Sequence, residues 1–156
     1  MKLYLVQHGK ALAKEEDPER PLNVQGELDV RNMASQLGDA GVQVARVWHS
    51  GKQRAARSAE ILAAKVLSGR TIETIKGISP NDPVAEFASD ADVWNEDTLV
   101  VGHLPFMSRL VSLLSVGDAE HELVQFTPGS VVCLARQDDH HWVIAWMMRP
   151  DLYTAD

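Results

Sequence analysis

Short apolar runs along this chain alternate with longer stretches in which apolar residues recur every three or four positions. The short runs predict buried strands, which we expect at residues 2–6, 44–48, 71–75, 97–101, 130–136 and 141–148. The longer stretches predict helices, because residues at this spacing share one helix face. We expect helices from Asn23, as N-cap, to Gly38 or Gly41, from residue 52 to about residues 68–69, over residues 83–90 and over residues 104–114.

Strands that alternate with helices imply right-handed crossovers and a mainly parallel sheet covered on both faces. The last two strands are separated only by residues 137–140, so they form a hairpin and add at least one antiparallel strand. We therefore predict an α/β fold, a three-layer α/β/α sandwich. Residues 10–22 are polar and hold two prolines, which indicates a long loop of a length that is often functional. No linker or repeat interrupts the 156 residues, so we expect a single domain over residues 1–156.

Two of the predicted strands end beside a glycine and a histidine, in Gln7-His8-Gly9 and in Gly102-His103. Ligand sites of open α/β sheets lie outside the carboxyl ends of the strands, where we expect both imidazoles. Gly9 allows the backbone to approach an anion closely, and its carbonyl can fix an imidazole tautomer that leaves one ring nitrogen nucleophilic. His103 stands at the start of a predicted helix, where free amides favour an anion. Taken singly, a histidine at a strand end such as His8 is more often structural than catalytic, and His103 is equally well explained as a polar cap of a turn.

Arg54 and Arg57 lie three residues apart on one face of a predicted helix. Arg54 is nearer the turn at Ser50 and Gly51, and is better placed to reach the carboxyl edge of the sheet. A guanidinium binds phosphate oxygens in pairs, whereas a solvated cation is the ordinary alternative for either arginine. Two histidines and one arginine at the same edge indicate a pocket for an anionic group.

Charge and composition exclude several classes of partner. The chain carries 15 basic and 22 acidic side chains, a formal net charge of −7, which disfavours binding to nucleic acid or to an anionic membrane. It has no apolar run of membrane-spanning length and no signal-peptide pattern, and Cys133 is the single cysteine, so we expect a cytoplasmic protein without disulfides. A metal site of His8, His49 and His103 has no carboxylate or H-x-H spacing to support it, so we expect no metal and no cofactor.

Four stretches, in this order, resemble the motifs of the histidine phosphatase superfamily: residues 6–11, 20–26, 50–55 and 102–105. The short length, with Arg-Pro-Leu-x-x-x-Gly and Gly-His-Leu-Pro, makes the chain most similar to the SixA-type phosphohistidine phosphatases, over residues 2–148. The resemblance implies that His8 is a nucleophile that accepts the phosphoryl group, that Arg54 clamps phosphate and that His103 is the second pocket histidine. Arg20 matches a recurrent arginine in the loop before the first helix.

The chain departs from this pattern at Gln7, where the family has an arginine immediately before the nucleophile. An amide still donates hydrogen bonds to a phosphoryl oxygen, but charged hydrogen bonds are roughly twice as strong as neutral ones. Lys10 is a candidate for supplying the missing positive charge. One alternative function follows directly from Gln7: a non-catalytic domain that binds phosphate or a phosphoprotein.

The resemblance implies two in-line displacements: His8 attacks phosphorus, and water then releases inorganic phosphate from phospho-His8. Arg54, His103 and Gln7 would stabilise charge on the phosphoryl oxygens, which needs no metal. An alkoxide leaving group needs a carboxylic acid to protonate it, whereas imidazole, with a pKa of about 6.5, leaves readily. Asp82 is the best candidate for that acid, but we expect it instead to cap the following helix.

We therefore predict a metal-independent enzyme of signal transduction that hydrolyses phosphohistidine on a partner protein, for example a phosphotransfer domain. The alternative on the same scaffold is a phosphomonoesterase acting on a small phosphate ester.

Overall fold

The computed structural model describes residues 1–68 and 71–152. The strands are β1 (Lys2–Gln7), β2 (Arg46–His49), β3 (Ile72–Thr74), β4 (Thr98–Gly102), β5 (Val131–Arg136) and β6 (Trp142–Met148). The helices are α1 (Val24–Asp39), α2 (Gln53–Val66), α3 (Ala85–Ala91), α4 (Phe106–Val116) and the 3₁₀ helix η1 (Pro150–Leu152). In this part of the chain, none of the helices combines the length and the apolar character needed to cross a bilayer.

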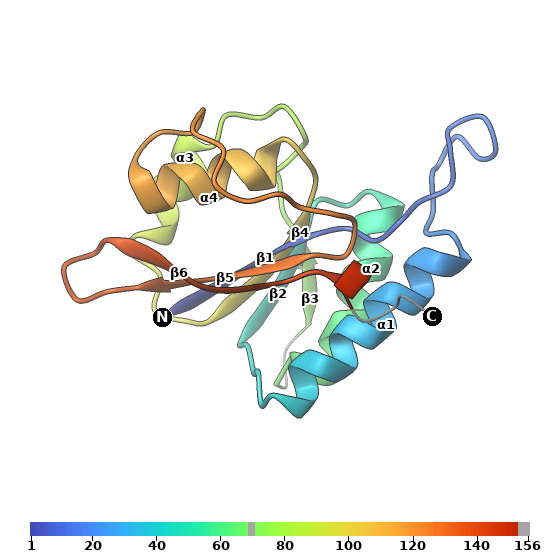
Figure 1. Cartoon of the computed structure of the whole chain (residues 1–156), viewed down its shortest axis with the longest axis horizontal. Coiled ribbons are helices and arrows are strands. Elements are labelled where there is room, and N and C mark those ends of the chain that lie inside the picture. Colours follow the sequence, from blue (N-terminus) through green and yellow to red (C-terminus); the bar gives the residue numbers. More distant parts are fainter. Residues whose placement is uncertain (69–70, 153–156) are drawn as a thin grey trace.

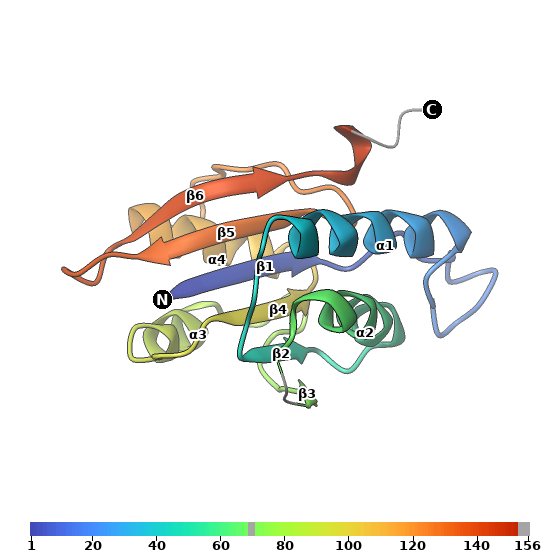
Figure 2. The same ribbon diagram turned by 90° about the horizontal axis from the view of Figure 1, so that it is seen from below.

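The six strands form one sheet in the order β3-β2-β4-β1-β5-β6. The first four strands along the chain run parallel, β5 pairs antiparallel with β1, and β6 pairs antiparallel with β5. Helices α1 and α2 cover one face of the sheet, and α3 and α4 cover the other (Figures 1 and 2). The predicted three-layer α/β/α sandwich with an antiparallel C-terminal hairpin is confirmed.

The core lies on both faces of the sheet because successive side chains of a strand point to opposite sides. In β1, Tyr4 and Val6 pack toward α1 and α2, whereas Leu3 and Leu5 pack toward α3 and α4. Helix α1 buries the predicted stripe Val30, Met33, Ala34 and Leu37. The sequence of β1 is apolar on both faces for this reason, as is usual for a central strand.

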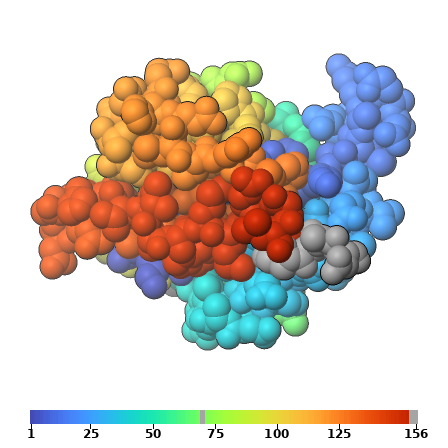
Figure 3. Space-filling view, in the orientation of Figure 1, coloured from blue at the N-terminus to red at the C-terminus, as the bar shows by residue number. Residues whose placement is uncertain are grey.

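The predicted N-cap of α1 and the predicted glycine turn after this helix are both found in the structure. The side chain of Asn23 caps α1 by accepting a hydrogen bond from the Gly26 amide at 2.7 Å. After α1 ends at Asp39, Gly41 adopts a φ of +80°, a conformation that favours glycine, so the second of the two candidate glycines turns the chain. Residues 10–22 form the predicted loop, which stands out from the body of the molecule in blue (Figure 3).

The boundaries that differ from the prediction include the starts of β2, α3 and α4 and the end of α2. Val44 forms only an isolated bridge with Leu67, because the neighbouring β4 begins to pair with β2 at Arg46. Helix α2 ends at Val66, before the predicted end at residues 68–69, of which residue 69 lies outside the described residues. Helix α3 begins at Ala85, two residues later than expected, after a hydrogen-bonded turn over residues 79–82. Helix α4 begins at Phe106 because the residue before a proline disfavours the helical conformation.

Candidate active site

His8, which follows β1, and His103, which follows β4, lie side by side. Strands β1 and β4 are neighbours, with Gln7 opposite Gly102, and the His8 amide donates to the Gly102 carbonyl at 3.1 Å. The ring centroids of His8 and His103 are 5.1 Å apart. Parallel pairing therefore brings together two imidazoles that are 95 residues apart in the sequence.

A pocket of about 490 Å³ opens at this edge of the sheet. It is lined by most of the residues singled out from the sequence, namely Gln7, His8, Arg20, Arg54 and His103, and also by Lys10. Gly9 lies behind the lining and is buried. Three of the lining side chains, Lys10, Arg20 and Arg54, are cationic. None of the described residues that line the pocket carries a carboxylate, so the pocket is suited to an anion.

His8 is held in one tautomer. Its Nδ1 lies 2.7 Å from the Gly9 carbonyl oxygen. Because a carbonyl oxygen only accepts, Nδ1 carries the hydrogen, and Nε2 of the neutral ring keeps its lone pair. Burial lowers the pKa of His8 to about 4; the Gly9 contact opposes that shift, and the charges of Arg54 and Arg20 add to it. The ring is therefore neutral and nucleophilic at pH 7.

His103 is held by its other nitrogen. Its Nε2 lies 2.6 Å from the hydroxyl oxygen of Ser50, and its Nδ1 is buried without a hydrogen-bond partner. Burial is the main cause that lowers the pKa of His103 to about 3, and the neighbouring His8 and Arg54 contribute to this shift. When Ser50 donates to Nε2, Nδ1 carries the hydrogen of the neutral ring and can donate to a bound oxygen.

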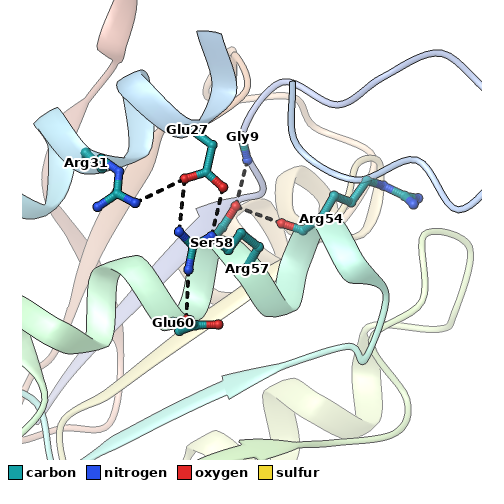
Figure 4. A network of polar contacts seen from close by, with 7 residues as sticks. All are labelled: Gly9, Glu27, Arg31, Arg54, Arg57, Ser58 and Glu60. Atoms are coloured by element: carbon teal, nitrogen blue, oxygen red, sulfur yellow. Dashed lines mark hydrogen bonds and ion pairs between the residues drawn. The ribbon is translucent and has the colours of Figure 1, made fainter. Parts of the chain in front are cut away.

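Ser58 joins the strand turn to α2. Its hydroxyl accepts a hydrogen bond from the Gly9 amide at 3.0 Å and donates to the Arg54 carbonyl at 2.8 Å (Figure 4). A Cβ added at Gly9 would lie 2.7 Å from Val30 Cγ2, so this glycine is required by close packing. Ser58 was not predicted as a site residue from the sequence. Its spacing from Arg54 suits a bond to the carbonyl four residues earlier, a local signal too common to identify a site.

The two arginines of α2 lie in different surroundings. Arg57 pairs with Glu27 and Glu60, each at 2.8 Å, away from the pocket (Figure 4). Arg54 lines the pocket, and its Nε is buried without a hydrogen-bond partner. Because a buried donor without a partner is costly, a bound anion would relieve this arrangement.

Arg20 and Gln7 complete the lining. Arg20 has a φ of +47°, which is unusual for a residue with a side chain, and its Nε donates to the Leu12 carbonyl at 3.1 Å. Gln7 is 9% exposed, and its side-chain oxygen Oε1 is buried without a hydrogen-bond partner. Its backbone is fixed by β5, since its amide donates to the Ser130 carbonyl at 3.1 Å.

Two other residues considered in the sequence lie outside the pocket. Asp82 does not cap α3; its carboxylate accepts from the Ser79 amide at 2.8 Å and lines a neighbouring groove. The reason is the tight turn over residues 79–82, which ends before the helix begins. His49 accepts a hydrogen bond from the Gly51 amide through Nδ1 at 3.0 Å. In the part of the chain that the structure describes, no three histidine, cysteine, aspartate or glutamate side chains form a metal-binding group.

Residues 3–79 match the family model of the histidine phosphatase superfamily (branch 1). The phosphohistidine phosphatase SixA of Escherichia coli is 24% identical over 155 residues, which cover 96% of this chain and 94% of that protein. The structure of the protein histidine phosphatase SixA complexed with tungstate superposes with a TM-score of 0.85 at 24% identity, covering 96% of this chain and 97% of that one. The α-ribazole phosphatase from Shigella flexneri superposes with a TM-score of 0.73 at 15% identity, covering 96% and 97% of the two chains. The fold is thus shared by proteins named for different phosphorylated substrates.

Proposed function

Because residues 3–79 of this chain match the family model of the histidine phosphatase superfamily and the chain has the fold of SixA, we propose that it hydrolyses phosphohistidine on a partner protein through a phospho-His8 intermediate. Phosphatase activity is the function that the family match supports, and the choice of substrate is our proposal. The observation that carries it is the tautomer of His8. With Nδ1 bound to the Gly9 carbonyl at 2.7 Å, the lone pair of Nε2 is available in a cationic pocket.

In the first step, Nε2 of His8 forms a bond to phosphorus while the bond from phosphorus to the substrate imidazole breaks. The electron pair of the broken bond stays on the substrate imidazole, whose other ring nitrogen carries a proton, so a neutral imidazole leaves. The phosphorylated His8 ring is positively charged because Nδ1 keeps its hydrogen. The Gly9 carbonyl that accepts this hydrogen stabilises that charge.

The pocket stabilises the phosphoryl oxygens in both steps. The guanidinium groups of Arg54 and Arg20 offset their negative charge, and Nδ1 of His103 donates a hydrogen bond. In the second step, a water oxygen bonds to phosphorus and the bond to Nε2 breaks, which returns the electron pair to His8. The proton lost by water leaves with inorganic phosphate or passes to solvent.

The leaving group favours phosphohistidine over a phosphate ester. An alkoxide of high pKa needs a nearby acid, and the described residues that line the pocket include no aspartate or glutamate. Imidazole has a pKa of about 6.5 and departs with little help. The partner in this proposal is therefore a protein that displays phosphohistidine.

The test compares wild type with His8→Ala on a phosphohistidine protein and on an aryl phosphate, with His140→Ala as the control. His140 lies exposed in the β5–β6 turn, so its removal should leave turnover unchanged. We expect wild type to release phosphate faster from the phosphohistidine protein, and His8→Ala to show only background. A preference for the aryl phosphate would support an esterase, and equal background from all three proteins would leave only a phosphate-binding role.

A further inference from the structure

A second, larger hollow lies next to the phosphate pocket. This groove has a volume of about 740 Å³ and is bordered by β2, by α3 and by the segment that follows β3. Three aromatic side chains line it, namely Trp48, Phe87 and Trp94. The rings meet edge to face, with centroids 5.0 Å apart for Trp48 and Trp94 and 5.2 Å for Phe87 and Trp94. We call this hollow the aromatic groove.

The aromatic groove is acidic, in contrast to the phosphate pocket. Asp82, Glu86 and Asp90 line it, against Lys76 as its one basic lining residue among those the structure describes. Glu86 and Asp90 are four residues apart on α3 and exposed, so their carboxylates project from the same side of the helix. The phosphate pocket presents Lys10, Arg20 and Arg54 instead. Two neighbouring hollows of opposite charge therefore lie on this chain.

The two hollows share a wall. Pro80 lines the phosphate pocket and Asp82 lines the aromatic groove, so two residues of backbone, about 7 Å at full extension, connect them. This wall is fixed, because the Asp82 amide donates to the Ser79 carbonyl at 3.0 Å and the Asp82 carboxylate accepts from the Ser79 amide. A chain whose phosphohistidine occupies the pocket has neighbouring residues within reach of the groove.

The aromatic rings already attract a cation. The Arg46 guanidinium carbon lies 4.3 Å from the ring centroid of Trp48 and 5.0 Å from that of Trp94. Indole faces beside carboxylates favour lysine and arginine side chains, which place their apolar stems on the rings and their charges near the acids. Val93 adds apolar surface to the groove and is 76% exposed. Acidic or purely apolar segments would meet repulsion or leave these carboxylates unpaired.

We propose that the aromatic groove docks a basic segment of the protein whose phosphohistidine enters the pocket, an inference that rests on the proposed function. The phosphoryl group meets the arginines while lysine or arginine side chains beside it meet Glu86, Asp90 and the indole rings. This arrangement selects for a phosphohistidine flanked by positive charge. It also distinguishes a protein substrate from free phosphohistidine, which fills only the pocket.

The test uses two synthetic phosphohistidine peptides that differ only in their flanking residues, lysine and arginine in one and glutamate in the other, together with free phosphohistidine. For wild type we expect kcat/KM to be about tenfold higher or more on the basic peptide, a difference that shrinks as salt rises. The double variant Glu86→Lys/Asp90→Lys should abolish this preference while leaving turnover of free phosphohistidine unchanged. The control Asp39→Lys/Asp138→Lys makes the same charge change at two exposed positions outside the groove and should keep the preference.

Equal kcat/KM on the basic and acidic peptides, or a preference that survives the groove variant, would overturn the docking proposal and leave the proposed function standing. Loss of the preference in the control pair would overturn it as well, since the effect would then be one of net charge. If wild type hydrolyses none of the three substrates faster than His8→Ala, the proposed function fails and the docking proposal fails with it.

Discussion

The ends of β1 and β4 each place a histidine in the phosphate pocket, but the two rings are held through different nitrogen atoms. Each presents a histidine beside a glycine at the same edge of the sheet, half-buried for His8 and buried for His103, and desolvation lowers the pKa of both imidazoles. His8 is held through Nδ1 by a backbone carbonyl, whereas His103 is held through Nε2 by the Ser50 hydroxyl. Among the described residues, the nitrogen that has no hydrogen-bond partner is therefore Nε2 in His8 and Nδ1 in His103.

The partners of the two rings explain what each can do. A carbonyl only accepts, so His8 has one neutral tautomer and keeps a lone pair on Nε2. A hydroxyl can donate or accept, so His103 can present Nδ1 with or without a hydrogen. The same strand-end pattern thus gives a fixed nucleophile at one position and an adaptable hydrogen-bonding group at the other, which are the roles that our proposal assigns.

The largest expected effect separates the two histidines. His8→Ala should lower kcat on a phosphohistidine protein about a thousandfold or more, because the covalent route is lost. His103→Ala should lower kcat about a hundredfold, because only hydrogen bonding to the phosphoryl group is lost. Steady-state phosphate release measures both. A greater loss in His103→Ala would reverse our assignment of the two strand ends.

The pKa values of His8 and His103 test whether desolvation acts on both rings. Histidine ring chemical shifts followed by NMR should give a pKa of about 4 for His8 and about 3 for His103, against the ordinary value of 6.5. This lowering means that protons bind more than about a hundredfold more weakly, so kcat/KM should hold as pH falls below 6.5 and decline only as His8 protonates near pH 4. In Arg54→Ala both pKa values should rise, since a positive charge is removed. Titration of His8 near 6.5 would contradict the environment described here.

Arg54 is one of the charges that lower the pKa of both rings, and Arg57, on the same helix, is its matched control. Arg54→Ala should lower kcat/KM about a hundredfold, the scale of one lost transition-state contact to a phosphoryl group. Arg57→Ala breaks only the half-buried pair with Glu27 and the more exposed pair with Glu60, both away from the pocket, and should change kcat/KM less than about twofold. Equal losses in the two variants would place the phosphate elsewhere.

The Ser50 hydroxyl holds the His103 ring, so replacing Ser50 should change the position of His103 and leave that of His8 unaltered. Ser50→Ala should lower kcat about tenfold, because the His103 ring loses the contact at Nε2 that orients it. Ser50→Thr keeps the hydroxyl and should retain most of the activity. The pKa of His8, followed by NMR, should stay near 4 in both variants, because its own contact with Gly9 is untouched. Unchanged kcat in Ser50→Ala would show that the hydroxyl does not position the ring.

The smallest effect is expected at Gln7, beside His8. Gln7→Arg should raise kcat a few-fold by adding a positive charge at the pocket wall, since charged hydrogen bonds are about twice as strong as neutral ones. Gln7→Met, of similar size without hydrogen-bonding groups, should lower kcat. Unchanged kinetics in Gln7→Arg would show that Lys10 or another lining cation already supplies the charge.

Much of this fold could be predicted because hydrophobic spacing and local chemistry agree. Leu3–Val6 reads as a buried strand and is one, and Asn23 predicts the start of α1 through its own side chain. The start of β2 could not be predicted, because it depends on where β4 begins to pair. Strand ends are set by partners that are distant in the sequence.

The same limit applies to the site. His8, His103 and Arg54 could be proposed because each stands at a strand end or helix start, where the fold class places ligands. The hydrogen bonds between Ser50 and His103 and between the Gly9 amide and the Ser58 hydroxyl join residues about 50 positions apart, with nothing local to indicate them. The aromatic groove likewise could not be predicted from the sequence, since Trp48 and Trp94 come into contact only after folding.

The central claim is best tested by trapping the intermediate. Wild type mixed with a phosphohistidine protein and quenched rapidly in alkali, which preserves the bond from phosphorus to nitrogen, would be digested and its peptides sequenced by mass spectrometry. We predict a transient phosphoryl group on His8, present in wild type, longer-lived in His103→Ala and absent in His8→Ala. Phosphate release without any phosphorylated His8, or phosphorylation of His103 instead, would contradict this account.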